Sequence, residues 1–354
     1  MKNLRNTNPY AEVNWSNTPR VTTSTHMHCL NQETLNSFIS QGLELAAISN
    51  YYPSMPYYPL SSMRENTVRV RQPGYVKDGI WHTDVLNYNE AIAPWCSELP
   101  KASRTQLPFR EGKRLFPNVP EGLLEIPNAE HHYFSDASIY LHVTAPGATL
   151  SSSMFDLKKE FALAEHGYDF GVRLPWRESF QKLYDSLLTP DGGGIVIAHP
   201  SWSHHPISYL EMLLDSDPRI LGIEVFNNCS RIDYSDVSED LWDAILSSGR
   251  QCFGFFVVDH PRPNRNWLGR IVLLPEERTA ESCLRAMRRG RFYGAISGNG
   301  LRFEYIHFDG HMLTAACNRP VEFQLISKIG VINDITFGTK FHFEFPEADR
   351  EKHT

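Results

Sequence analysis

Five strand-like runs in this chain, most of them apolar, each stop at a residue type that binds metal ions. These runs are 23–28 (TSTHMH), 123–130 (LLEIPNAE), 139–142 (IYLH), 194–199 (GIVIAH) and 255–259 (FFVVD). In α/β barrels the reactive groups sit at the carboxyl ends of the strands. Strands that end on His, Glu and Asp can therefore gather these side chains into one metal site. The pattern predicts an α/β barrel with the metal centre of a hydrolase.

Strands and helices alternate along most of the chain. The predicted helices cover 32–41, 177–188, 207–214, 239–248 and 280–289. The predicted strands cover 21–28, 43–48, 123–130, 138–143, 195–198, 222–226, 252–258 and 292–296. Such alternation indicates a parallel sheet with right-handed crossovers. About seven units of this kind favour closure into a barrel.

Two regions depart from the alternation. Residues 52–122 are rich in Tyr and Pro and lack periodic runs, which predicts a long ordered lid over the site. From residue 298 onward strand-like runs follow one another, and Asp309-Gly310 between two of them is a hairpin signal. We therefore expect a barrel over 1–297 and a small β module over 298–354.

The composition limits the kinds of partner that the protein is expected to bind and the compartment in which it is expected. A net charge of −7 argues against a nucleic-acid partner, because phosphates attract basic surfaces. No apolar stretch approaches the ~18 residues of a membrane span, and no signal peptide is visible at the start. Six scattered cysteines without a C-x-x-C pair fit reduced thiols. A cytoplasmic protein that does not bind membranes is expected.

Four of the candidate ligands suggest two ions. His26 and His28 stand two residues apart, so on a strand both imidazoles lie on one face. Glu130 can bridge two ions through its two oxygens, which favours a binuclear site. His199 follows a buried strand and precedes a proline, where a core role is hard to explain.

The neighbouring residues say less about the roles of the remaining candidate ligands. His142 interrupts an apolar run and is either a ligand or a core histidine bonded to the main chain. Asp259 is a hard anionic ligand at a strand end, and His260 contributes if the chain turns there. His204 and His205 are expected to be a solvated pair.

Six ordered motifs resemble the PHP (polymerase and histidinol phosphatase) family of metal-dependent phosphoesterases. They are NPYAEVNW (8–15), THMH (25–28), IPNAEHH (126–132), GGGIVIAHPSW (192–202), LGIEVFNN (221–228) and AMRRGRFYGAISG (286–298). The resemblance implies a distorted (β/α)7 TIM-like barrel, two or three Zn, Mn or Fe ions, and phosphoester hydrolysis. Some members of the family also carry a C-terminal β module.

The resemblance also assigns roles to single residues. His26 and His28 match the family's first motif, Glu130 its bridging carboxylate, and Asp259 the carboxylate of its last motif. His142 and His199 match its later histidines.

Two departures from the family fall on ligands of a third ion. The family has Asp-His after the second strand, where this chain has Asn50-Tyr51. Its last motif places a His two residues after the Asp, where this chain has Pro261. These substitutions imply a reduced site of two divalent ions, or of one.

The expected function is hydrolysis of a small phosphorylated substrate, with Glu130 and Asp259 as the catalytic carboxylates. Metal binding lowers the pKa of water to ~7 and supplies hydroxide at neutral pH. Two alternatives stay open. One is an amidohydrolase-type enzyme, although such enzymes bridge their metals with a modified Lys and no strand here ends in one. The other is a degenerate barrel that binds a ligand without turnover, for which Asn50, Tyr51 and Pro261 argue.

Overall fold

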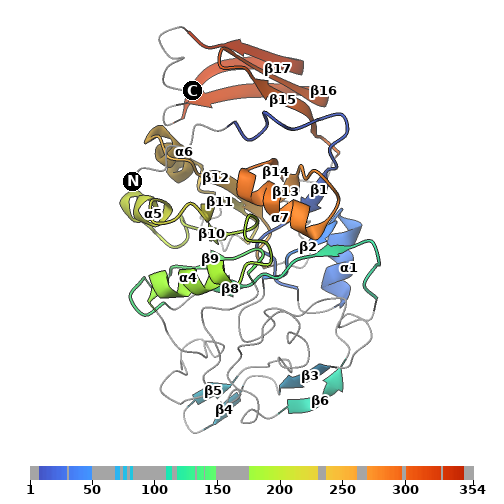
Figure 1. The fold of residues 1–354 in the computed structure, drawn as a ribbon, viewed down its shortest axis with the longest axis vertical. Coiled ribbons are helices and arrows are strands. Elements are labelled where there is room, and N and C mark those ends of the chain that lie inside the picture. The colour runs from blue at the N-terminus through green and yellow to red at the C-terminus, as the bar shows by residue number, and fades with distance from the viewer. Residues whose placement is uncertain are drawn as a thin grey trace.

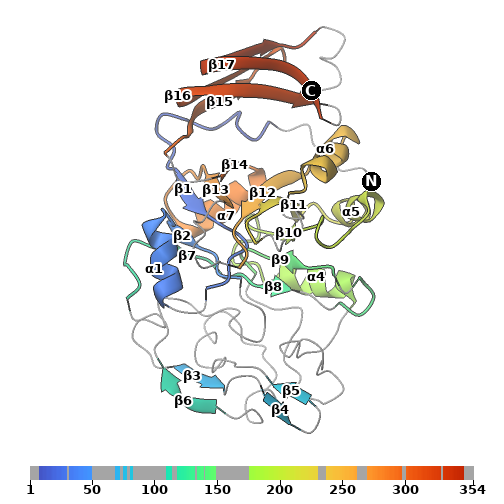
Figure 2. The ribbon, with the colours of Figure 1, turned by 180° about the vertical axis from the view of Figure 1, so that it is seen from behind.

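A computed structural model of the chain describes most of the predicted core. The described residues are 8–29, 32–49, 68–71, 75–77, 80–82, 109–113, 118–131, 134–138, 140–148, 175–229, 237–260, 269–296, 300–327 and 330–346. They include helices α1 (Gln32–Ser40), α4 (Trp176–Asp185), α5 (Ile207–Leu214), α6 (Glu239–Ser247) and α7 (Ala280–Arg289). Figure 1 and the reverse view in Figure 2 show these helices around the central strands, with a separate sheet at one end of the molecule.

The strands form several hydrogen-bonded sheets. The N-terminal strands are β1 (Val21–Thr23), β2 (Leu45–Ala46), β3 (Val68–Arg71), β4 (Tyr75–Lys77), β5 (Ile80–His82), β6 (Phe109–Lys113), β7 (Leu124–Glu125), β8 (Glu130–His131) and β9 (Val143–Thr144). The later strands are β10 (Ile195–Ile197), β11 (Ile220–Asn227), β12 (Phe253–Val257), β13 (Gly269–Leu273), β14 (Phe292–Ile296), β15 (Phe303–Phe308), β16 (Met312–Ser327) and β17 (Val331–Glu344). The central sheet has the order β12-β11-β10-β9-β8.

Parallel and antiparallel pairs are mixed. β10, β11 and β12 are parallel, as the alternation predicts. β9, however, runs antiparallel to both β8 and β10. β13 and β14 flank α7 and still pair antiparallel, and β13 also pairs antiparallel with β1. Strand–helix–strand alternation predicts parallel neighbours, so it does not predict these pairs.

The five predicted helices are confirmed, with ends within three residues of those expected. Helix α7 shows why. The Thr279 hydroxyl accepts a hydrogen bond from the Ser282 N–H at 3.2 Å, and Gly290 follows with a φ of 69°. A Thr N-cap and a left-handed Gly after the last turn are signals that sequence carries.

Several predicted strands are longer than the observed ones, whereas β14 matches the prediction and β11 extends beyond the predicted 222–226. The run 123–130 is divided into β7 and β8 around Pro127, which has no N–H to donate. The Asn128 amide instead donates to the carbonyls of Thr25 and Ala47, and its oxygen accepts from the Ala145 N–H. Of the described residues in the run 138–143 only Val143 belongs to a strand, and before it the Leu141 N–H donates to the Ser138 carbonyl at 2.9 Å.

Main-chain hydrogen bonds connect segments at the ends of several strands. The bonds are Ser49 N–H to Met27 O (2.9 Å), Glu130 N–H to Ser49 O (3.0 Å), Ala198 N–H to His142 O (3.0 Å) and His28 N–H to Asp259 O (3.0 Å). Met27 and Asp259 also form a parallel bridge. These bonds bring the strand ends into contact with one another. The closed seven-unit barrel stays a prediction.

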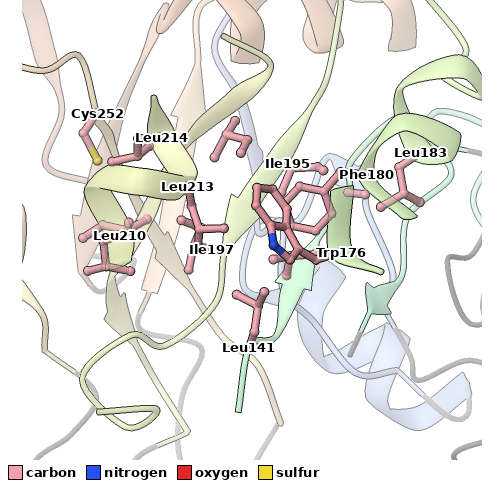
Figure 3. Packing of buried hydrophobic residues seen from close by; sticks show 14 of the residues in the cluster. Leu141, Trp176, Phe180, Leu183, Ile195, Ile197, Leu210, Leu213, Leu214 and Cys252 are labelled. Atoms are coloured by element: carbon pink, nitrogen blue, oxygen red, sulfur yellow. The ribbon is translucent and has the colours of Figure 1, made fainter. Parts of the chain in front are cut away.

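The strand that leads to His199 is buried on both faces. Ile195 and Ile197 of β10 pack in the cluster shown in Figure 3, where side chains of α4 and α5 meet. Val196, which points to the opposite side, belongs to a second buried cluster. A strand held in this way gives the residue at its end a fixed position.

The C-terminal strands β15, β16 and β17 form an antiparallel sheet with its own buried cluster. The predicted hairpin at Asp309-Gly310 is confirmed as the connection between β15 and β16. The boundary between residues 297 and 298 stays a prediction. Most of the predicted lid at 52–122 lies outside the described residues. Among those that are described, no helix is both long and apolar enough to cross a membrane.

Candidate metal centre

Six of the seven predicted ligands come together as two groups of three. The groups are His26, His28 and Asp259, and Glu130, His142 and His199. Within each group the potential ligand atoms lie within 4.8 Å of one another. His26, His28, His199 and Asp259 follow β1, β10 and β12, as their positions in the sequence predict, whereas Glu130 begins β8 and His142 precedes β9.

The first group surrounds one oxygen of Glu130. Nε2 of His26 lies 3.2 Å from Oε2 of Glu130, and Nε2 of His28 lies 3.1 Å from the same oxygen. Oδ1 of Asp259 lies 3.3 Å from His26 Nε2 and 3.4 Å from His28 Nε2. Two nitrogens and two oxygens thus point toward one place.

The second group surrounds the other oxygen of Glu130. Nδ1 of His142 lies 2.7 Å from Oε1 of Glu130, and Nε2 of His199 lies 3.5 Å from it. The His142 side chain is 13% exposed, whereas that of Glu130 is 1% exposed. The carboxylate of Glu130 therefore lies between the two groups, and each of its oxygens faces one of them.

A bend after β1 orients the first two histidines. The Ser24 hydroxyl donates to the carbonyl of His26 at 2.7 Å and accepts from the Val258 N–H at 3.0 Å. Met27 between the histidines is buried in an apolar cluster. The imidazoles of His26 and His28 lie close together, with ring centroids 5.3 Å apart, although both residues lie beyond the end of β1 at Thr23.

Two of the six residues have a strained main chain. His199 has a φ of 25° and Asp259 a φ of 55°, which residues other than Gly rarely adopt. At Asp259 the N–H donates to the carbonyl of His26 at 2.7 Å. At His199 the N–H donates to Oε2 of Glu224 at 2.9 Å. Such strain costs free energy and concentrates at functional sites.

Glu224 on β11 is a site residue that the sequence patterns did not single out. Its Oε1 lies 2.7 Å from Nδ1 of His26, and its Oε2 accepts from the His199 N–H and from Nδ2 of Asn227. Nδ2 of Asn227 also donates to Oδ2 of Asp259 at 3.0 Å. A carboxylate behind a metal-binding histidine fixes the tautomer and the orientation of its ring. A charged residue inside an otherwise apolar buried strand was the available signal.

The carboxyl groups are ionised in this environment. Burial opposes the charge of His26, but the carboxylates of Asp259 and Glu224 outweigh it and raise the pKa of His26 well above its usual range. Burial also opposes the charge of Glu130, yet the facing His26 lowers the pKa of that carboxyl well below its usual range. The pKa of Asp259 is lowered by His26 and His28 against the same burial. Without a metal, protonated histidine compensates the charge of these carboxylates, and a bound cation would take the place of that proton.

The donor set fits a divalent metal ion. With a metal bound, the Glu224 carboxylate that faces Nδ1 of His26 would hold the ring proton on Nδ1 and leave the Nε2 lone pair for the ion. His26 Nε2 and Asp259 Oδ1 are both buried, and neither has a hydrogen-bond partner among the described residues. Lone pairs that converge in this way repel one another unless a cation or a proton lies between them. Imidazole and carboxylate ligands suit Zn, Mn and Fe ions.

The other histidines lie differently. His260 is not in either group; its ring stacks on His28 with centroids 3.8 Å apart, and its Nε2 is 3.9 Å from Asp259 Oδ1. The prediction that His204 and His205 form a solvated pair is wrong for His205, which is buried against Tyr209. Asn50, Tyr51 and Pro261, the departures from the family pattern, lie outside the described residues.

Comparisons with known proteins give little beyond these contacts. No family model matches the chain, and no curated protein matches it. A solved two-domain protein from Bacteroides vulgatus ATCC 8482, which contains a predicted PHP-like metal-dependent phosphoesterase, is similar to it with a TM-score of 0.42 and 12% sequence identity. The similarity covers 93% of this chain and 89% of that chain. At this TM-score it carries no argument, so the metal centre is derived from the residues of this chain.

Proposed function

We propose that this protein is a metal-dependent phosphoesterase with two divalent ions. The observation that supports it best is the position of Glu130, whose two oxygens face two separate groups of ligand atoms. A shared carboxylate is how proteins hold two ions close enough to act on one phosphoryl group. Zn, Mn and Fe are the candidate ions, because the ligands are imidazole and carboxylate.

The two proposed ion sites differ in their number of protein ligands. With Oε2 of Glu130 the first group offers four donor atoms, whereas the second group offers Oε1 of Glu130 and one nitrogen each from His142 and His199. Structural zinc sites have four protein ligands, and catalytic sites have three and leave a position for water or substrate. The second site is therefore the proposed position of the reaction.

The chemistry follows from the charges in the centre. Bound divalent ions would lower the pKa of water and neutralise negative charge on the phosphoryl oxygens. The Glu224 carboxylate is hydrogen-bonded to Nδ1 of His26, and this bond keeps Nε2 of His26 directed at the first site. The Ser203 hydroxyl lies 3.2 Å from Nδ1 of His199 and orients that imidazole toward the second site in the same way.

We also propose that the strands close into the distorted (β/α)7 barrel that the sequence motifs imply, with the β15–β17 sheet as a separate module. The bonds between successive strand ends support closure, as does the parallel bridge between Met27 and Asp259. In a closed barrel all six proposed ligands lie at one rim.

The two alternatives differ from this proposal in testable ways. An amidohydrolase-type enzyme would cleave amides and would bridge its ions with a modified Lys, whereas here a carboxylate lies between the two groups. A degenerate barrel would bind a ligand without converting it to a product. A small phosphorylated substrate is preferred to nucleic acid because the chain has a net charge of −7.

The deciding experiment combines metal analysis with hydrolysis assays. Protein loaded with Mn²⁺ or Zn²⁺ is expected to bind two ions and to hydrolyse p-nitrophenyl phosphate but not p-nitroacetanilide. Glu130→Gln should abolish hydrolysis, and Glu322→Gln, on the exposed side of β16, should not. Bound metal without hydrolysis of any ester would favour the degenerate barrel, and hydrolysis of the amide alone would favour the amidohydrolase.

A further inference from the structure

Two aromatic side chains lie in the open beside the second group of ligands. Tyr140 is 50% exposed and Trp202 is 38% exposed. Their rings contact each other edge to face, with centroids 5.8 Å apart and planes at 89°. Scattered single apolar residues are common on surfaces, but a contacting Tyr–Trp pair marks a candidate binding surface.

Trp202 is in direct contact with both histidines of that group. Its ring centroid is 4.9 Å from that of His199 and 5.8 Å from that of His142. The proposed three-ligand ion site is therefore bordered by an indole, and the exposed part of the indole adjoins the place where a phosphoryl group would bind.

The segment that carries Trp202 is fixed by hydrogen bonds. The Ser203 N–H donates to the carbonyl of His199 at 3.0 Å, and the His205 N–H donates to that of Pro200 at 3.1 Å. Next to Trp202, the Ser201 hydroxyl donates to the carbonyl of Val237 at 3.2 Å. Since the segment is already ordered, little conformational entropy is lost when a ligand packs on the ring.

We propose that Trp202 and Tyr140 form a subsite for a planar ring in the alcohol part of the phosphoester. This proposal rests on the proposed function and adds the class of substrate. The phosphoryl group lies at the ions, and the ring of the leaving alcohol stacks on the aromatic pair. Stacking of a flat ring on an aromatic side chain stabilises a complex substantially and tolerates many ring types.

The experiment compares two esters of primary alcohols, benzyl phosphate and ethyl phosphate, with the full-length metal-loaded protein. Trp202→Ala is expected to lower kcat/KM for benzyl phosphate by about tenfold, mainly through KM, and that for ethyl phosphate by less than about twofold. Trp202→Phe should retain most of the preference because it keeps a ring. Phe337→Ala removes an aromatic ring that is 77% exposed on β17 and serves as the matched control, with no change expected.

Other outcomes overturn the proposal. An equal loss with both esters, together with a lower metal content, would mean that Trp202 only supports His142 and His199. No preference of the wild-type protein for the benzyl ester would also overturn it. If the wild-type protein hydrolyses neither ester, the proposed function fails and the subsite is decided by calorimetric binding of benzylphosphonate against ethylphosphonate. A benzyl preference that disappears in Trp202→Ala supports the subsite, and equal binding refutes it.

Discussion

Oε1 of Glu224 lies 2.7 Å from Nδ1 of His26, and both side chains are fully buried. The same carboxylate accepts from the His199 N–H, so one residue of β11 orients a member of each ligand group. Partners behind the ligands tune metal affinity by orienting the rings that bind.

Glu224→Gln is therefore expected to weaken metal binding while the fold is kept. Three N–H donors face the carboxylate, from His26, His199 and Asn227, and an amide presents one oxygen and an NH₂ in its place. Loss of such a partner costs about 10- to 100-fold in metal affinity. Competition with a chelating dye measures the effect. Glu322→Gln is the control, and an affinity equal to that of the wild type would contradict a positioning role.

His199→Ala should remove one ion and leave the other. The first group with Oε2 of Glu130 keeps four donors, whereas the second group would retain only Glu130 and His142. Elemental analysis of the purified, metal-loaded protein is expected to give two ions for the wild type and one for the variant. His204→Asn, at an exposed position with a φ of 52°, should keep both ions. A variant that retains two ions, or none, would show that the sites are not arranged as proposed.

The sequence predicted the ligand residues of the metal centre better than the residues that orient these ligands. His26, Glu130 and Asp259 could be found because each follows a strand-like run, and strand ends meet at one edge. Glu224 carries the same kind of signal, since a charged side chain within a buried apolar strand needs partners. Its partners, however, lie far along the chain, and periodicity does not identify them.

The pairing of β8, β9 and β13 could not be derived from the pattern. Next to β8 and β9, contacts between a side chain and the main chain, such as those of Asn128, take the place of strand-to-strand bonds. Hydrophobic periodicity reports which face is buried, but not whether neighbours run parallel. The ends of the helices were predictable because their signals, such as the Thr279 cap and Gly290, are local.

Asn128→Ala should destabilise the protein strongly. The side chain is 1% exposed and satisfies the carbonyls of Thr25 and Ala47 and the N–H of Ala145. Each unsatisfied buried group costs about 1–3 kcal/mol, so a loss of roughly 3 kcal/mol in the free energy of unfolding is expected. Urea denaturation of both forms measures the difference. Asn318→Ala is the control, because its amide also donates to a carbonyl but is exposed, and it should lose less than about 1 kcal/mol.

Gly193→Ala should disturb the turn that leads into β10 and His199. Gly193 has a φ of +64°, and a Cβ at this position would lie 2.1 Å from the carbonyl oxygen of Pro146. Gly310→Ala is the matched control, since Gly310 also has a positive φ, of +92°, but nothing lies within 4 Å of an added Cβ. A left-handed conformation costs roughly 1–2 kcal/mol in both variants. Overpacking should add about 1–3 kcal/mol in Gly193→Ala alone, and equal thermal stabilities of the two variants would contradict this.

The free energy of unfolding should decrease as the pH is lowered through a window that depends on His205. Burial lowers the pKa of His205 to about 4, and the charges of His199 and His142 act in the same direction. In the unfolded chain the pKa of a histidine is about 6.5. Between these two values His205 binds one more proton in the unfolded chain than in the native one, so its contribution to the free energy of unfolding decreases as the pH is lowered from about 6.5 to about 4. One proton corresponds to a slope of about 1.4 kcal/mol per pH unit.

His205→Gln removes this group, so the variant should lose less stability than the wild type over the same window. Urea denaturation of chelator-treated protein at several pH values between 4 and 7 measures both slopes, and removal of metal keeps proton release by metal binding out of the comparison. His204→Asn, one residue earlier and exposed, is expected to follow the wild-type slope. If the His205→Gln and wild-type slopes coincide, His205 is not held neutral by burial in the native protein.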